Sequence, residues 1–306
     1  MGRIEQYWNK ISGSHEAVET LTSVTPNGTP IEDPRRRLES FGLSHVGKVR
    51  TGNEDHFVVA SLQRSLEIRQ TNLEERGLFS PLCGPKAYLF AVADGVGGQE
   101  GGKLASGITI RTIVEYLSET VGSYHAVPSG QEHAFLDPLH AAVQRAQETL
   151  LSTFGKPEGG PSTTLTIVLL VWPQAFLVHV GDSRAYHLRG GRLTRLTRDQ
   201  TIGAFLLDEK AMTEQEVEQC GYNNVLSSAI GSAEMTPAVS ELTLQQGDVL
   251  LLCTDGLTKH VPEKQIASVL AKAANAEAAC RELIDLALAD GGRDNITVVV
   301  ANTLTS

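Results

Sequence analysis

Four aspartates stand at the ends of apolar runs, and they are the first sign of chemistry in this sequence. Asp94 follows residues 88–93, Asp182 follows 175–181, Asp255 follows 249–254, and Asp294 precedes 295–301. Runs of this length and composition predict buried β-strands, so each carboxylate is expected at the edge of a sheet. A single Asp-Gly after a strand can be only a turn. The repetition favours a site that holds an ion or a phosphate.

The stretch after Asp94 is unusually rich in glycine, with Gly95, Gly97 and Gly98 followed by a second glycine pair. Residues without a Cβ allow tight turns and let the backbone approach a ligand closely. A segment with helical spacing follows, over residues 102–120. This order of strand, carboxylate, glycine-rich turn and helix suits the binding of an ion or a phosphate.

A polar loop between the first two predicted strands contains Arg50, Glu54 and Asp55. Charge is ordinary in a solvated hairpin loop, and that reading needs no function. A loop that joins two core strands can also reach the sheet edge where Asp94 is expected. There, the guanidinium of Arg50 would offer a planar fork of donors to the oxygens of a phosphate.

The bulk composition limits the class of protein. With 306 residues, of which 41% are hydrophobic, the chain can bury a large core, and its net charge of −10 argues against nucleic-acid binding. No apolar stretch reaches the length of a membrane span, and the first residues do not resemble a secretory signal. The widely spaced cysteines favour a reduced cytoplasmic compartment, and they are Cys83, Cys220, Cys253 and Cys280.

The order of predicted elements is strands, two helices, strands, a flap, strands, two helices and a strand. The strands are expected at 41–47, 56–61, 88–93, 162–172, 175–181, 184–189, 192–196, 238–244, 248–254 and from 295, and the paired helices at 102–120, 138–154, 262–273 and 276–290. This order predicts an α+β fold, a four-layer α-β-β-α sandwich of two antiparallel sheets flanked by antiparallel helix pairs. The domain limits expected are a poorly ordered arm at 1–40 and a single domain at 41–306, with an excursion at 62–86 and a flap at 199–230.

Six short motifs in this order resemble those of the metal-dependent protein phosphatase family known as protein phosphatase 2C, bacterial type. They are Asn53-Glu-Asp, Ala91-Val-Ala-Asp-Gly-Val-Gly-Gly, Gly160-Pro-Ser-Thr-Thr, Val180-Gly-Asp-Ser-Arg, Leu252-Cys-Thr-Asp-Gly-Leu and Asp294-Asn-Ile-Thr-Val. The resemblance implies a sandwich fold, two Mn²⁺ or Mg²⁺ ions, and hydrolysis of phosphoserine and phosphothreonine in proteins. The nucleophile it implies is a water or hydroxide that bridges the two ions.

The resemblance also implies a role for each acidic residue. Asp94 would bridge both metals and orient the nucleophilic water, with the carbonyl oxygen of Gly95 on one metal. Asp255 and Asp294 would complete the other metal's ligands. The remaining matches are Glu54 and Asp55 as carboxylates that contact a metal through water or another ligand, Asp182 at a third, weaker metal, and Arg50 on the phosphate. Hard divalent cations do prefer such oxygen ligands.

Two positions depart from the family's pattern. Some members carry a histidine where this chain has Val96, and many bacterial members carry one where it has Gln99. The general acid is therefore unassigned, and metal-bound water is the expected proton donor. His45 and His56 lie nearby, and a structural role is expected for both.

Three classes of function are compatible with these residues. The favoured one is an active serine/threonine phosphatase, because every metal carboxylate is present. A phosphatase-like regulatory module, or a hydrolase of small phosphate compounds on the same fold, is the alternative. The partners implied by the resemblance are phosphoproteins and a Ser/Thr kinase, with no nucleic acid and no membrane, and the chain is expected to be a monomer.

Overall fold

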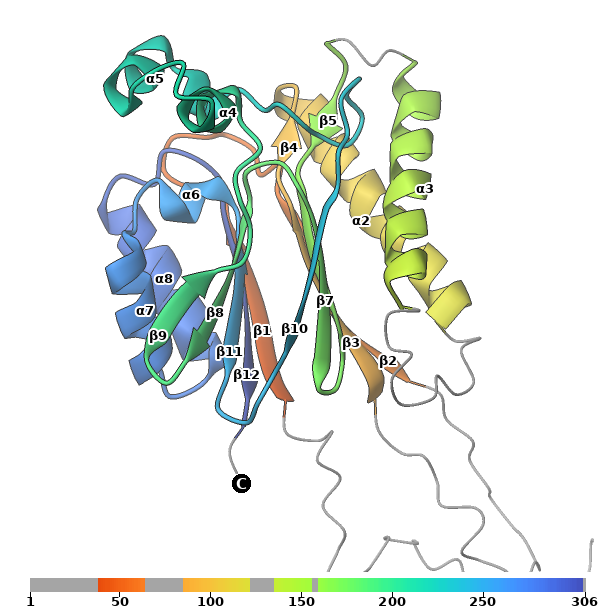
Figure 1. Ribbon diagram of the computed structural model, residues 1–306, viewed down its shortest axis with the longest axis vertical. Coiled ribbons are helices and arrows are strands. Elements are labelled where there is room, and N and C mark those ends of the chain that lie inside the picture. Colours follow the sequence, from red (N-terminus) through yellow and green to blue (C-terminus); the bar gives the residue numbers. More distant parts are fainter. Residues whose placement is uncertain (1–37, 64–84, 122–134, 156–158, 305–306) are drawn as a thin grey trace, which may run out of the picture. The chain divides into compact units, whose positions relative to one another are not determined.

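Two five-stranded antiparallel sheets lie face to face at the centre of the structure, which is a computed structural model describing residues 38–63, 85–121, 135–155 and 159–304 (Figure 1). The first sheet has the order β1 (Leu38–His45), β12 (Ile296–Thr303), β11 (Val249–Cys253), β8 (Arg184–Arg189) and β9 (Arg192–Arg195). The second has the order β10 (Ala238–Thr243), β7 (Gln174–Val180), β6 (Leu165–Val171), β3 (Pro85–Ala93) and β2 (His56–Gln63).

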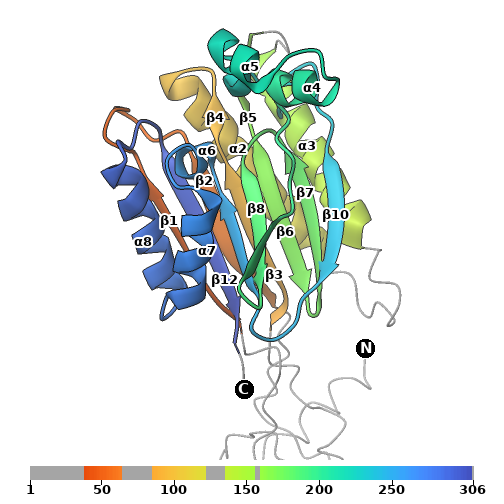
Figure 2. The same cartoon turned by 60° about the vertical axis from the view of Figure 1, so that its left-hand side comes forward.

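A pair of helices covers the outer face of each sheet (Figure 1, Figure 2). The pair on the second sheet is α2 (Gln99–Val121) and α3 (Leu136–Phe154), and the pair on the first is α7 (Glu263–Lys272) and α8 (Ala276–Ala289). The predicted α+β fold, a four-layer α-β-β-α sandwich, is confirmed.

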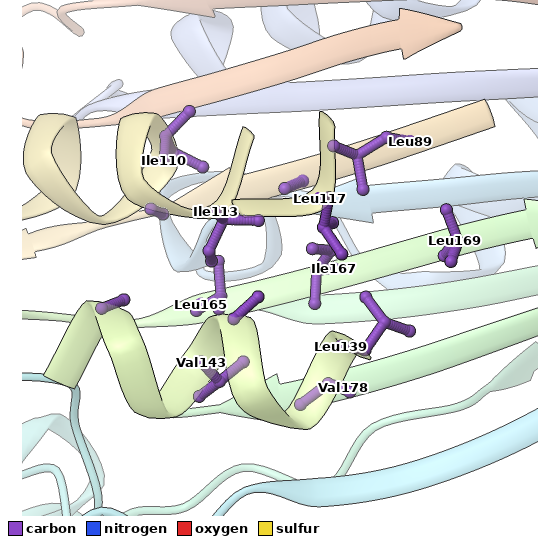
Figure 3. Close-up of a cluster of buried hydrophobic side chains, with 14 of the residues drawn as sticks. Leu89, Ile110, Ile113, Leu117, Leu139, Val143, Leu165, Ile167, Leu169 and Val178 are labelled. Atoms are coloured by element: carbon purple, nitrogen blue, oxygen red, sulfur yellow. The ribbon is translucent and has the colours of Figure 1, made fainter. Parts of the chain in front are cut away.

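Strand β3 shows how the sequence produces these layers. Successive side chains of a strand point to opposite faces of a sheet. Phe90 and Val92 therefore enter the core between the two sheets, whereas Leu89 and Ala91 pack under the helix pair. Figure 3 shows Leu89 with the side chains that α2 and α3 contribute to this outer core. A run of apolar residues without alternation is required because both faces are covered.

The first sheet joins distant parts of the chain. Strand β1 pairs antiparallel with β12 along its whole length, from Leu38 opposite Thr303 to His45 opposite Ile296. Strand β12 also pairs with β11, so it lies inside the sheet. The loop after β1 and the segment before β12 are thereby brought to the same end of the sheet.

Short elements gather at that end of both sheets (Figure 1, Figure 2). They are β4 (Gly95–Val96), β5 (Ser162–Thr163), α6 (Asp255–Thr258), and, in the flap, α4 (Ile202–Asp208), α5 (Glu214–Cys220) and the 3₁₀ turn η3 (Tyr222–Asn224). Within the flap, a helix is predicted from the sequence around residues 213–219, which α5 confirms, whereas α4 was not predicted. The strand expected over 162–172 is divided into β5 and β6.

Some predicted boundaries fall outside the described residues. The arm at 1–40 is described only for its last three residues, which begin β1, and the excursion at 62–86 only at its two ends. The domain limits therefore stay predictions. Across the described part of the chain, no helix has the length and apolarity needed to cross a membrane.

Candidate metal centre

Antiparallel pairing brings all the predicted acidic residues to one end of the two sheets. His56, the first residue of β2, pairs with Ala93, the last of β3, so Asp55, just before β2, and Asp94, just after β3, lie at the same end of two adjacent strands. In the other sheet, Cys253 pairs with Val298, which places Asp255 and the segment before β12 at the same end.

Two threonines hold the backbone of Asp94: Thr163, in β5, and Thr164, the residue after β5. The amide N–H of Asp94 donates to Oγ1 of Thr164 at 3.0 Å, and the N–H of Thr164 donates to the carbonyl oxygen of Asp94 at 2.9 Å. The hydroxyl of Thr163 donates to the same carbonyl oxygen at 2.8 Å. These contacts use up the main-chain groups of Asp94 and leave its carboxylate to face the cluster of acids.

Gly95 is glycine because there is no room for a side chain. A Cβ at this position would overlap the carbonyl oxygen of Gly102 and approach that of Glu54 to 2.9 Å. A Cβ on Gly102 would in turn overlap Oε2 of Glu54. The start of α2 and the end of the β1–β2 loop thus pack directly against β4, and the Gly95 backbone stays beside Asp94.

Asp55 is buried, and only one of its carboxylate oxygens is satisfied. Oδ2 accepts hydrogen bonds from Oγ1 of Thr254 at 2.9 Å and of Thr297 at 2.7 Å, whereas Oδ1 is buried without a hydrogen-bond partner. Burial, with a smaller contribution from the charge of Asp255, raises the pKa of Asp55 to about 7 against the opposing effect of the two threonines. An unsatisfied buried carboxylate oxygen is costly unless a proton or a cation binds it.

Asp255 begins α6, and it shows the same imbalance. Its Oδ1 is also buried without a hydrogen-bond partner, and its Oδ2 forms an ion pair with Nζ of Lys259. Burial raises the pKa of Asp255 above its ordinary value, although the charge of Lys259 opposes this shift.

Asp294 lies between two cationic side chains. Nε of Arg50 is 2.9 Å from Oδ1 of Asp294, and Nη2 of Arg50 donates to Oδ2 at 3.1 Å. Nζ of Lys259 is 3.9 Å from the same Oδ2. Hydrogen bonding to Asp294 and its charge raise the pKa of Arg50, with smaller contributions from Glu54 and Asp94. Arg50 therefore belongs to the same cluster as the acids, as the sequence predicted.

The side chain of Asn295 ties the β1–β2 loop to this segment. Its Nδ2 donates to the carbonyl oxygens of Val46 at 2.9 Å and Gly52 at 3.0 Å, and its Oδ1 accepts from the N–H of Glu54 at 2.8 Å. Its own N–H donates to Oδ1 of Asp294 at 3.0 Å. Asn295 therefore sets the positions of both the β1–β2 loop, which carries Arg50, and Asp294.

Asp182 follows β7 and completes the cluster. Burial raises its pKa to about 7; the charge of Asp255 adds to this shift, whereas that of Lys259 reduces it. The next residue, Ser183, hydrogen-bonds through its Oγ to Oγ1 of Thr164 at 2.8 Å, which links this turn to the one holding Asp94.

The raised pKa of Asp94 shows that the acidic residues interact electrostatically with one another. Burial raises the pKa of Asp94 well above its ordinary value, and the charges of neighbouring carboxylates raise it further. In decreasing order of effect, these neighbours are Asp55, Asp255, Asp182 and Asp294. Such a set of buried and half-buried carboxylates supplies the oxygen donors that Mn²⁺ and Mg²⁺ prefer, so the residues fit divalent ions. Among the described residues, no group of three acidic, histidine or cysteine side chains is already placed to hold one metal ion.

The structure brings together all eight residues named from the sequence: Arg50, Glu54, Asp55, Asp94, Gly95, Asp182, Asp255 and Asp294. The residues that the sequence analysis missed are those that position them: Thr163, Thr164, Thr254, Asn295 and Thr297. All five lie inside the motifs quoted above, so the motifs could have pointed to them. His45 and His56 have local partners, since Nδ1 of His45 accepts from the N–H of Gly47 at 2.9 Å and Nδ1 of His56 lies 2.9 Å from Oγ of Ser106.

Comparison with known proteins agrees with this architecture. Residues 83–290 match the family described as protein phosphatase 2C. The chain is 35% identical over 246 residues to the serine/threonine protein phosphatase PstP of Mycobacterium tuberculosis, an alignment that covers 78% of this chain and 46% of that protein. The chain therefore spans about half the length of this curated relative.

Solved structures of this relative share the fold. The crystal structure of the Mycobacterium tuberculosis serine/threonine phosphatase PstP superposes with a TM-score of 0.68 at 31% identity, covering 88% of this chain and 99% of that one. The catalytic domain of PstP in complex with two manganese ions gives a TM-score of 0.66 at 31% identity, covering 88% and 99%. Fold and sequence together define a phosphatase-type α-β-β-α sandwich with an acidic centre. The chain belongs to the protein phosphatase 2C family.

Proposed function

We propose that this chain hydrolyses phosphoserine and phosphothreonine in proteins with the help of two divalent metal ions, Mn²⁺ or Mg²⁺. The observation that supports this most is the cluster of buried and half-buried carboxylates around Asp94, in which Asp55 and Asp255 each keep one buried oxygen without a partner. Membership of the protein phosphatase 2C family and the two manganese ions bound by the PstP catalytic domain support the same proposal.

The chain's own residues divide the work. Asp94 would hold both ions, the carbonyl oxygen of Gly95 would bind one of them, and Asp255 with Asp294 would bind the other. Glu54 and Asp55 would contact the ions through water or another ligand, and Asp182 would lie beside them. The ions supply positive charge that acidifies water and offsets the charge on the transferring phosphoryl group.

Arg50 would bind the phosphate of the substrate. Its guanidinium is held by both oxygens of Asp294, so the remaining donors are oriented before a substrate arrives. A preoriented fork loses little entropy when a phosphate binds. Val96, on the exposed strand β4, has no proton to donate, so no side chain at that position protonates the leaving group.

The partners follow from this chemistry. The substrates are phosphorylated proteins, and the expected counterpart is a Ser/Thr kinase whose products this chain reverses. A cytoplasmic location is proposed from the cysteines, of which Cys220, Cys253 and Cys280 are free thiols. A monomer is expected, and sedimentation of the purified protein measures this.

The decisive experiment measures phosphate release from a phosphothreonine peptide and from p-nitrophenyl phosphate, with Mn²⁺ or with EDTA. Release from the peptide that requires Mn²⁺ is the expected result. Asp255→Asn should abolish release, whereas Asp285→Asn, at an exposed position on α8, should not change it. A folded sample that binds Mn²⁺ and releases no phosphate from either substrate would instead support the regulatory module. Release from p-nitrophenyl phosphate alone would indicate a small-molecule hydrolase.

A further inference from the structure

Lys259 lies at the centre, and neither the sequence motifs nor the proposed mechanism uses it. It directly follows α6, and its N–H donates to the carbonyl oxygen of Asp255 at 2.9 Å. This i,i+4 spacing directs its side chain back over the first turn, where Nζ pairs with Oδ2 of Asp255. Nζ is also 3.9 Å from Oδ2 of Asp294.

The ammonium group also acts on Asp182, which the second sheet contributes. Its positive charge lowers the pKa of Asp182, and the charge of Asp182 raises the pKa of Lys259. For Lys259, burial opposes this shift, and Asp255 and Asp294 contribute more than Asp182 does. The ammonium of Lys259 is therefore paired with Asp255, lies near Asp294, and acts electrostatically on Asp182 of the other sheet.

We propose that the ammonium of Lys259 takes the place of a third divalent ion beside Asp182 and Asp255, so that this chain binds two divalent ions and not three. The inference rests on the proposed metal-dependent function. It concerns the position that the family resemblance assigned to a third, weaker metal at Asp182.

Charge and geometry support this assignment. A lysine ammonium is a compact point charge with three donors, and it can pair with several carboxylate oxygens that surround it. It is tethered to the same helical turn as Asp255, so it loses no translational freedom on binding. A divalent cation shared by Asp182 and Asp255 would meet the repulsion of this charge in a partly buried site, because Nζ of Lys259 already pairs with Oδ2 of Asp255.

Lys259 can be changed without damage to the core. Its side chain is 41% exposed, whereas that of Asp255 is 15% exposed, so the lysine reaches the cluster from the solvent side. Lys259→Met keeps the length of the side chain and removes the charge. Lys259→Arg keeps the charge, and Lys264→Met, on the exposed side of α7, is a matched control for loss of a lysine.

The test counts Mn²⁺ ions per chain by equilibrium dialysis followed by metal analysis. Two ions are expected for the wild-type protein, for Lys259→Arg and for Lys264→Met, and three for Lys259→Met. Combining Lys259→Met with Asp182→Asn should return the count to two, which locates the additional ion at Asp182.

A second measurement separates this role from that of an ordinary surface ion pair. In EDTA, Lys259→Met should melt at a lower temperature than the wild-type protein, and Mn²⁺ should raise its melting temperature by more than it raises that of the wild type. An ordinary ion pair would leave the count at two and give the same melting difference with and without Mn²⁺.

The outcomes distinguish this inference from the proposed function. Three ions in the wild-type protein, or two in Lys259→Met, would overturn the role of Lys259. No Mn²⁺ binding by the wild-type protein would overturn both proposals. Two ions without phosphate release would count against the phosphatase function, and the count in Lys259→Met would still decide the role of Lys259.

Discussion

Strand β11 has an aspartate at each end, buried Asp248 and half-buried Asp255, and the two are in opposite electrostatic states. Before the strand, Asp248 accepts two hydrogen bonds from Arg189, at 2.8 and 2.6 Å, and one from the N–H of Gln245 at 2.7 Å, and Nε2 of His187 lies 3.0 Å away. After the strand, Asp255 has one oxygen with no hydrogen-bond partner.

The pKa values express this difference. Burial raises the pKa of Asp248, but the hydrogen bonds from Arg189 and its neighbours outweigh burial and leave this pKa below its ordinary value. The pKa of Asp255 is raised. In the sequence, both residues are carboxylates next to the same apolar strand. What distinguishes a structural acid from a candidate metal ligand is therefore how completely its charge is compensated.

The largest expected effect comes from exchanging each acid for its amide. Asp255→Asn should lower the rate of phosphate release by at least about a hundredfold, because the charge of a proposed metal ligand is lost, and should not destabilise the metal-free protein. Asp248→Asn should instead lower the free energy of unfolding by about 1–3 kcal/mol, because buried hydrogen bonds to a charged group are lost. Urea unfolding in EDTA and phosphate release with Mn²⁺ measure both. Equal loss of stability in the two variants would remove the distinction.

Asn295→Ala tests the residue that joins the two loops of the centre. Its side chain makes three hydrogen bonds to main-chain groups, so we expect a loss of about 2–4 kcal/mol in unfolding free energy and a clear fall in kcat. Asn302→Ala, on the strand β12 that follows Asn295, is the matched control, because its Nδ2 makes a single, longer bond of 3.3 Å to Glu39. A variant of Asn295 that loses stability and keeps its kcat would show that this amide does not position the centre.

Arg50→Ala tests the proposed phosphate-binding fork. We expect KM for a phosphopeptide to rise about tenfold, with a smaller effect on kcat, because one charge-assisted contact to the phosphate is lost. Arg281→Ala, which removes an exposed ion pair with Glu277 on α8, should leave KM unchanged. If the two variants had the same KM, Arg50 would not bind the substrate.

The smallest expected effect is a pH dependence of stability without metal. Asp55 and Asp182 have pKa values of about 7 in the folded protein, so the folded state keeps protons that the unfolded chain has released. Stability in EDTA should therefore fall as the pH rises from about 4 through 7, by several degrees in melting temperature. Asp248 acts in the opposite sense, and its contribution is lost on acidification below about pH 4. A melting temperature in EDTA that rises between pH 5 and pH 8 would contradict the raised values.

Much of this architecture could be predicted because its causes are local. The strand at 88–93 is evident from six consecutive apolar residues, and Asp94 with its glycines marks where that strand must end. The long-range partners could not be derived. Asp55 is held by Thr254 and Thr297, which lie 199 and 242 residues away in the sequence, and only the fold brings them together.

Other details depend on side-chain packing that periodicity does not encode. In the sequence, Lys259 is indistinguishable from an ordinary surface lysine, and only the structure shows that α6 brings its side chain to Asp255. The predicted strand at 162–172 is interrupted at Thr164, because the backbone and hydroxyl of that residue bind Asp94 in place of a neighbouring strand. Helix α4 was missed because its seven residues show no clear helical period and, unlike α5 with its Thr213–Glu216 capping box, it has no such start signal.

The position of β12 inside the first sheet has a consequence for how the protein is made. Strand β1 has β12 as its neighbour in the sheet, so residues 38–45 must wait for residues 296–303 before they can pair. Contacts with so great a sequence separation slow folding, and the nascent sheet stays exposed during translation. Asp294 reaches the centre through the same strand, so the first sheet and the complete acidic cluster form only after residues 294–303 have been made.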